Sequence, residues 1–205
     1  MSDPESTSVE SGIRERVPFY ALASRLLLEE VHGDTFDLLR ADPVRSVLIA
    51  ADSRCEAWLD QPWDDSRETN LREEYARLFL MSSGVPPFVS AWLEGDREKL
   101  GLELHDFVTG VLRALAREPR VVEPWGRLPL DHLGLILELV NLAAEEGTEV
   151  TVQIAQQVET ELLGEWLVVF SRTLVTKARE PLYAALGHLL EDLWNHRGED
   201  PDPTP

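Results

Sequence analysis

The sequence predicts an all-α protein, built as a single globular helical bundle. Apolar residues recur at spacings of three and four along most of the 205 residues, and this period is the main signature of amphipathic helices. No segment alternates apolar and polar residues convincingly, and no Asn-Gly or Asp-Gly pair offers a tight hairpin turn. With 43% hydrophobic residues, the chain can form one core, and about 70% of its unfolded surface can be buried.

Three helices are predicted in the N-terminal part of the chain. The first covers about Pro18 to Val31, and Pro18 is tolerated in its first turn. A short helix is expected near residues 36–40. Pro43 then opens a helix that runs through Trp58.

The next helix has its own start and stop signals. Asp65, followed three residues later by Glu68, resembles a capping box and predicts a helix N-terminus. Tyr75 and Phe79 are four residues apart on this helix and are expected to stack. The helix ends at the loop "SSGVPPFVSAW", since Gly84 and the two adjacent prolines exclude regular structure.

A long helix is predicted at about residues 98–117, followed by a second break. The segment "EPRVVEPWGRLP", residues 118–129, holds three prolines and one glycine in twelve residues. Such a segment cannot continue a helix, so it is the candidate hinge between two helical halves.

These breaks define the expected domain organisation. One helical domain spans residues 13–197, and its halves would be 13–118 and 129–197. The acidic, polar ends at residues 1–12 and 198–205 are expected to be disordered.

The helix after the hinge is expected to be central to the core. Two apolar stripes wrap most of its circumference. The narrow polar strip that remains comprises Asp131, Gly134, Glu138, Asn141 and Glu145. Two more helices close the fold, one from about Thr151 past Trp166 and one after Pro181.

The composition excludes several classes of partner. A net charge of −19 argues against binding to nucleic acid or to anionic lipid, because both need clustered basic residues. The charge permits a basic partner, and solubility or adaptation to a saline cytoplasm is the alternative explanation. Cys55 is the only cysteine, which favours a reducing compartment and a buried apolar role for that thiol. No apolar run approaches 18 residues and the N-terminus lacks signal-peptide features, so a cytoplasmic protein without membrane insertion is expected.

Motifs for catalysis, cofactors and metals are missing from the sequence. There is no Gly-rich phosphate loop and no Gly-x-Ser-x-Gly elbow. No two of the five histidines are three or four residues apart, which is the usual spacing of metal ligands on a helix. Asp131 and Glu138 would be about 10.5 Å apart along a helix, too far for one metal. No catalytic residue, cofactor or metal site is therefore expected.

The pair Asp131-His132 at the start of the central helix admits three interpretations. Asp131 can cap the helix by accepting backbone N–H bonds, with His132 an incidental neighbour. A catalytic dyad is disfavoured, because adjacent residues on a helix point about 100° apart. The third interpretation is a surface that binds a ligand.

The loop "GVPPFVSAW" is the second candidate region. Phe88 and Trp92 either fold back onto the core or form an exposed apolar groove. The acidic residues nearby are Glu73, Glu74, Glu94, Asp96 and Glu98. An apolar pocket with an acidic rim suits a peptide that carries arginines beside an apolar run.

Three segments in order resemble one known family. "EEYARLFL", "PPFVSAW" and "LPLDHLGLILELVNLA" are similar to motifs of the TorD/DmsD family of redox-enzyme maturation chaperones. The resemblance covers residues 73–144 and departs from the family at Leu162, where relatives often have a histidine. It implies an all-helical cytoplasmic chaperone rather than an enzyme. Such a protein binds the twin-arginine signal peptide, or the apo form, of a molybdopterin oxidoreductase catalytic subunit and holds it until cofactor insertion.

The resemblance also implies a peptide-binding surface. Its residues would be Glu74, Tyr75, Phe79, Pro86, Pro87, Phe88, Ser90, Trp92, Pro129, Asp131, His132 and Glu138. Asp131 would pair with an arginine of the peptide. A neutral His132 would bond the peptide backbone and begin to charge near pH 6.5, so affinity is expected to fall between about pH 7.5 and 5.5.

Two alternatives to this function stay open. The chain could be an assembly factor for a cytoplasm-facing respiratory molybdoenzyme complex, recognising the folded subunit rather than a leader peptide. The second alternative is a nucleotide-using enzyme, which is disfavoured because the sequence lacks a phosphate-binding loop. The protein could be a monomer, or a dimer that exchanges helices across the hinge at residues 118–129.

Overall fold

The computed structural model describes residues 4–93, 106–111, 113 and 129–195, with side chains from residue 16 onward. The described residues are mostly helical and contain no β-strand, which confirms the predicted all-α class. The α-helices are α1 (Pro4–Leu28), α2 (Gly33–Arg40), α3 (Val44–Ala51), α4 (Arg54–Leu59), α5 (Asp65–Tyr75), α7 (Leu133–Glu146), α8 (Glu149–Leu162), α9 (Trp166–Lys177) and α10 (Pro181–Asn195). A π-helical turn, Ala76–Leu80, follows α5, and a 3-10 turn spans Val89–Ala91.

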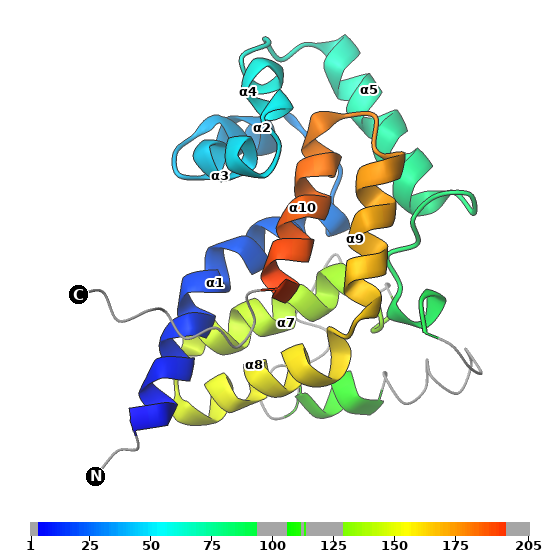
Figure 1. Cartoon of the computed structure of the whole chain (residues 1–205). Coiled ribbons are helices and arrows are strands. Elements are labelled where there is room, and N and C mark those ends of the chain that lie inside the picture. The colour runs from blue at the N-terminus through cyan, green and yellow to red at the C-terminus, as the bar shows by residue number, and fades with distance from the viewer. Residues whose placement is uncertain (1–3, 94–105, 112, 114–128, 196–205) are drawn as a thin grey trace.

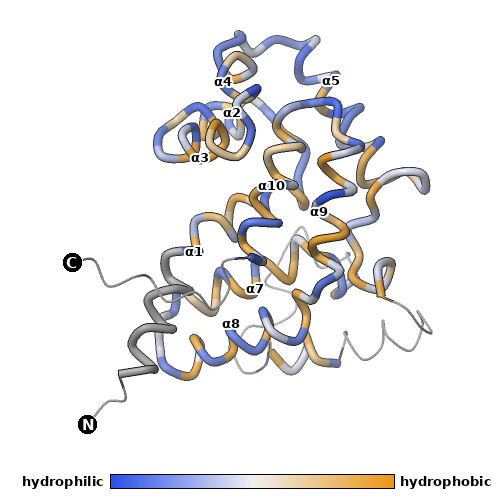
Figure 2. Tube along the Cα trace, in the orientation of Figure 1, coloured by the Kyte–Doolittle hydropathy of each residue, from blue (hydrophilic) through white to orange (hydrophobic). Residues whose placement is uncertain are grey.

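The helix α7 occupies the centre of the core, as the sequence predicts. It packs against α1 and α8, while α9 pairs with α10 (Figure 1). Leu133, Ile136, Leu137 and Val140 are fully buried. In Figure 2 α7 is largely hydrophobic whereas α5 is largely hydrophilic. The small helices α2, α3 and α4 form a separate group that contacts α10 through α3 and α4.

Several helix boundaries differ from those predicted. The helix α1 begins at Pro4 and ends at Leu28, so Pro18 lies inside the helix and not in its first turn. The helix also includes residues 4–12, for which the composition predicted disorder. The predicted helix from Thr151 past Trp166 is two helices, α8 and α9, separated at residues 163–165.

The prediction of a single helix from Pro43 to Trp58 is also wrong. It is divided into α3 and α4 by Asp52, whose backbone is extended. The Asp52 carboxylate accepts a bond from the backbone N of Arg54 at 2.9 Å and three bonds from the Arg54 side chain. A short acidic side chain that bonds nearby backbone in this way competes with the helical ladder and ends the first helix.

The N-cap residue of α5 lies one residue before the predicted cap. Asp64, not Asp65, is the N-cap residue, and its carboxylate accepts from the backbone N of Arg67 at 2.8 Å. The predicted contact between the rings of Tyr75 and Phe79 is confirmed; the ring centroids are 5.2 Å apart, and the planes meet edge-to-face at 66°.

Parts of the predicted organisation lie outside the described residues. These parts are the hinge at 118–128, the acidic residues Glu94, Asp96 and Glu98, and the predicted helix at 98–117 apart from residues 106–111 and 113, which are helical. Among the helices that the structure describes, none is both long and apolar enough to cross a membrane.

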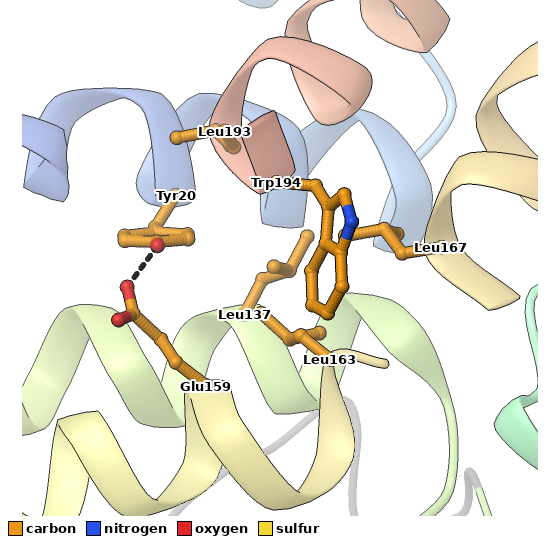
Figure 3. A pocket seen from close by; sticks show the side chains of 7 residues that line it. All are labelled: Tyr20, Leu137, Glu159, Leu163, Leu167, Leu193 and Trp194. Carbon is orange, nitrogen blue, oxygen red and sulfur yellow. Dashed lines mark hydrogen bonds between the residues drawn. The ribbon is translucent and has the colours of Figure 1, made fainter. Parts of the chain in front are cut away.

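A buried polar cluster ties α1 to α8. The hydroxyl of Tyr20 donates to the carboxylate of Glu159 (Figure 3). The Arg16 guanidinium donates to both oxygens of the same carboxylate, at 3.2 and 3.3 Å. The hydroxyl and the guanidinium both donate to the carboxylate and so offset part of the cost of burying it.

Candidate functional site

The Pro-rich loop is joined to the Asp-His turn by main-chain hydrogen bonds. The backbone N of Val89 donates to the carbonyl of Asp131 at 2.9 Å, and the N of Leu133 donates to the carbonyl of Pro87 at 2.7 Å. These bonds flank an isolated antiparallel bridge between Phe88 and His132. The structure therefore brings together two motifs that are about forty residues apart in the sequence.

Asp131 supports the loop and does not cap the helix. Its Oδ2 accepts from the hydroxyl of Ser90 at 2.6 Å and from the Ser90 backbone N at 3.4 Å. Asp131 is 8% exposed, and within the described part of the chain no donor is bound to its Oδ1. The prediction that Asp131 caps α7 is wrong, because the loop holds its carboxylate against Ser90.

His132 is the N-cap residue of α7. Its Nδ1 accepts from the backbone N of Gly134 at 3.1 Å, so the ring is neutral with the proton on Nε2. The ring also packs edge-to-face on Phe88, with centroids 5.3 Å apart. Burial lowers the pKa of His132 to about 4. The expectation that this ring begins to charge near pH 6.5 is therefore wrong.

Both aromatic residues of the Pro-rich loop fold back onto the protein while remaining partly exposed. The indole Nε1 of Trp92 donates to the carbonyl of Pro86 at 2.8 Å, and its ring packs on Phe170 with centroids 5.5 Å apart. Phe88 packs on His132 as described, and Pro87 is buried. The loop is thus held in a fixed position, and we call it the ridge; its residues Phe88 and Trp92 are partly exposed.

Gly134 allows α1 and α7 to approach closely. A Cβ at this position would lie 2.7 Å from Cγ of Leu28, well inside contact distance. The carbonyl of Gly134 also accepts from the hydroxyl of Ser24 at 2.9 Å. Glycine in the Asp-His-x-Gly pattern is therefore explained by helix packing.

Glu74, Tyr75 and Phe79 form a second cluster, which is mostly buried. The Tyr75 hydroxyl donates to the carbonyl of Leu27 at 2.9 Å. The Phe79 ring contacts both Tyr75 and Tyr183. The Glu74 carboxylate accepts two 2.7 Å bonds from the Arg77 guanidinium, and these donors lower its pKa although burial opposes them. This cluster fixes α5 against α1 and α10.

Glu138 is separate from the Pro-rich loop. It lies one turn beyond Gly134 on α7 and is half-buried. Burial raises its pKa, with smaller contributions from Glu145 and Glu29, whereas bonds with Ser24 and Asn141 act in the opposite direction. Pro129, at the other end of the turn, is exposed, and its carbonyl accepts from the backbone N of His132 at 3.0 Å.

Two of the cavities among the described residues differ greatly in size. The one in Figure 3 has a volume of about 10 Å³, which suits at most one water molecule. It lies between α1, α7, α8 and α10, next to Tyr20 and Glu159. The other is a cleft of about 530 Å³, which Glu74 and Arg77 line together with Asn70, Glu73 and Arg179.

Sequence reasoning missed the part of that cleft that lies outside the motif "EEYARLFL". Asn70 and Arg179 belong to none of the three motifs, and they are 109 positions apart in the printed numbering. One signal was available: Asn70 and Glu73 are three residues apart on the largely polar α5, so they share a face. No group of three histidine, cysteine or acidic side chains among the described residues is arranged to hold a metal ion.

Comparison with known proteins identifies the family of the chain. A family model described as "Nitrate reductase delta subunit" matches residues 47–172, a range that includes both the Pro-rich loop and the Asp-His turn. The chain is 26% identical over 137 residues to "Chaperone protein YcdY" of Escherichia coli (strain K12), covering 64% of this chain and 67% of that protein. The chain therefore belongs to the nitrate reductase delta subunit family, of the TorD type, and is a maturation chaperone of molybdoenzymes and not an enzyme.

Proposed function

We propose that this chaperone works in the cytoplasm, where it binds the signal peptide of a molybdopterin oxidoreductase catalytic subunit. It would hold the apo-subunit until the molybdenum cofactor is inserted, before export or assembly. The peptide is proposed to be of the twin-arginine type, with arginines beside an apolar run.

The observation that supports this proposal most is the preformed ridge of the Pro-rich loop. Phe88, Ser90 and Trp92 are partly exposed on a loop that two main-chain bonds fix to α7. A surface already held in place loses little conformational entropy when a ligand binds. Asp131 lies at its edge with one acceptor oxygen that no described residue uses, and a guanidinium is a suitable donor for that oxygen.

The remaining motif residues lie either at the ridge or in the packing clusters next to it. Pro86 and Pro129 flank the ridge, while Pro87 and His132 are buried beneath it. The residues Glu74, Tyr75, Phe79 and Glu138 lie in the neighbouring packing clusters. We propose that these four contribute to binding by positioning α5 and α7.

The experiment is calorimetric titration of the chain with a synthetic peptide in which two adjacent arginines precede an apolar run. Asp131→Asn removes the charge while an amide oxygen can still accept from Ser90, so affinity should fall about fivefold or more. Asp37→Asn, at an exposed residue of α2, is the matched control and should bind as the wild type does. Binding should also weaken as salt increases. Absence of binding by the wild-type chain would refute the proposal.

A second candidate function is favoured by the description of the matching family, which names a nitrate reductase subunit. In this case the chain would recognise the folded body of a cytoplasm-facing molybdoenzyme. Titration with the catalytic subunit lacking its N-terminal segment separates the two functions. Binding of the shortened subunit, without binding of the peptide, would support the second.

A further inference from the structure

The cleft of about 530 Å³ lies between the α5 region and the junction of α9 and α10. It is lined by Asn70, Glu73, Glu74, Ala76, Arg77, Met81, Arg179 and Glu180. Only Glu74 of these residues belongs to the peptide-binding surface that the family resemblance implies. The cleft is therefore distinct from the ridge of the Pro-rich loop.

Buried and charged groups hold the walls of the cleft in place. The Glu74 carboxylate accepts from the backbone N of Arg179 at 2.6 Å as well as from Arg77. The Arg77 guanidinium donates onward to the carbonyl of Lys177 at 2.6 Å. The Lys177 ammonium in turn donates to the carbonyls of Ser83 and Gly84, at 2.6 and 2.8 Å. Both walls are thus fixed before any ligand binds.

The charged residues of the lining carry a net charge of −1, which one bound cation would neutralise. Glu74 and Arg77 neutralise each other, which leaves Glu73 and Glu180 against Arg179. Glu180 accepts from the Trp58 indole N–H at 2.7 Å, so its carboxylate already has one donor. Glu73 is exposed and makes no ion pair with any residue that the structure describes. The net charge of −1 favours a single arginine or lysine over an acidic group.

The acceptors favour arginine over lysine. Asn70 and Glu73 are three residues apart on α5, so their side chains lie on the same face. A guanidinium has five N–H donors in a planar fork and can bond a carboxylate and a neighbouring amide oxygen together.

Two exposed apolar residues lie at the end of the π-helical turn, and one of them, Met81, lines the cleft. The π-helical turn Ala76–Leu80 buries both Leu78 and Phe79 and turns Leu80 outward. Leu80 is 68% exposed, and Met81, which lines the cleft, is 57% exposed. Exposed Met81 shares the lining with the Glu73 carboxylate, and exposed Leu80 precedes Met81 in the chain. This combination is complementary to an arginine next to apolar side chains.

We infer that this cleft binds one arginine of the client's signal segment, with the apolar residues beside that arginine packing on Leu80 and Met81. The inference rests on the proposed function, because it assigns a second contact region to the same client. The ridge of the Pro-rich loop and the cleft would then contact different parts of one peptide.

The experiment is fluorescence anisotropy with a labelled synthetic peptide of two adjacent arginines and an apolar run. Glu73→Gln and Leu80→Ser alter exposed residues, so both variants should fold. Each is expected to weaken binding about threefold to tenfold. The matched controls are Glu56→Gln on α4 and Leu38→Ser on α2, which alter exposed residues outside the cleft and should change affinity less than twofold.

A double-mutant cycle identifies the contact. Each arginine of the peptide is replaced in turn by glutamine and titrated against the wild type and Glu73→Gln. For the peptide arginine that contacts Glu73, the loss of affinity caused by its replacement and the loss caused by Glu73→Gln should not be additive, because both changes remove the same interaction. Peptide binding that is equally strong in the cleft and control variants would overturn the assignment of the cleft and leave the proposed function standing. No binding of the peptide to the wild type would overturn both.

Discussion

The hydroxyl of Ser90 donates a 2.6 Å hydrogen bond to Oδ2 of Asp131 and so joins two loops that are 41 residues apart. This bond occupies the carboxylate that the sequence offered as one candidate for a helix cap. The cap is supplied instead by the imidazole of His132. The three residues form one polar unit between the Pro-rich loop and α7.

Replacement of Ser90 by alanine should destabilise the protein. Among the described residues, the Asp131 carboxylate would keep only a 3.4 Å backbone donor, and a lost hydrogen bond to a charged group costs about 1.5–3 kcal/mol. Urea unfolding should therefore show a lower midpoint for Ser90→Ala. Ser82→Ala, at an exposed position, should leave the midpoint unchanged. Equal midpoints for the two variants would mean that the bond contributes nothing.

His132 should make stability depend on pH in the acidic range. Its pKa is lowered from 6.5 to about 4 by burial, so the unfolded chain binds the additional proton between these values. The free energy of unfolding contributed by this ring is complete above pH 6.5 and falls as the pH decreases to 4, by up to about 3 kcal/mol.

The measurement compares wild type with His132→Asn across this range. Asparagine can still cap the helix but does not titrate. The difference in unfolding free energy between the two proteins should shrink as the pH falls from 6.5 to 4. A difference that stays constant would show that the ring does not titrate in the expected way.

Gly134→Ala should be destabilising although alanine favours helices. The new Cβ would lie 2.7 Å from Cγ of Leu28, and an overpacked core typically loses about 1–3 kcal/mol. Gly110 is the control, since a Cβ there meets nothing within 4 Å. Gly110→Ala lies in a helical stretch and should stabilise by up to about 1 kcal/mol. Thermal unfolding of both variants would show shifts of opposite sign.

The thiol of Cys55 should be unreactive in the folded protein. Cys55 is fully buried, and burial raises its pKa to about 12, so almost no thiolate is present at about pH 8. A disulfide reagent should modify it only after denaturant is added. Rapid reaction of the native protein would contradict the buried position. Because Cys55 does not react in the folded protein, a cysteine introduced at exposed Asn70 would be labelled selectively and would report on the cleft.

Much of the fold could be predicted from the sequence because apolar periodicity determines which face of a helix is buried. The central position of α7 and the contact between Tyr75 and Phe79 are of this kind, since both depend on residues within one or two turns. The division at Asp52 was missed because a side chain competing with the helical ladder has no periodic signature.

The candidate site was harder to predict because its geometry depends on distant segments. The sequence offered Asp131 as a cap, but its carboxylate binds Ser90, which lies in another loop, and His132 caps α7 instead. The cleft depends in the same way on Arg179, whose backbone N is held by Glu74 across 105 residues. Local sequence patterns carry no information about such contacts.

The joining of the Pro-rich loop to α7 has a consequence for amide hydrogen exchange. The N–H of Val89 belongs to a loop, yet it is bonded to the turn that begins the most buried helix. Exchange of this proton requires the loop to separate from α7, an opening that also breaks the bond between Leu133 and Pro87. The two amides should therefore exchange at similar slow rates, as parts of one cooperative unit that spans a loop and a core helix.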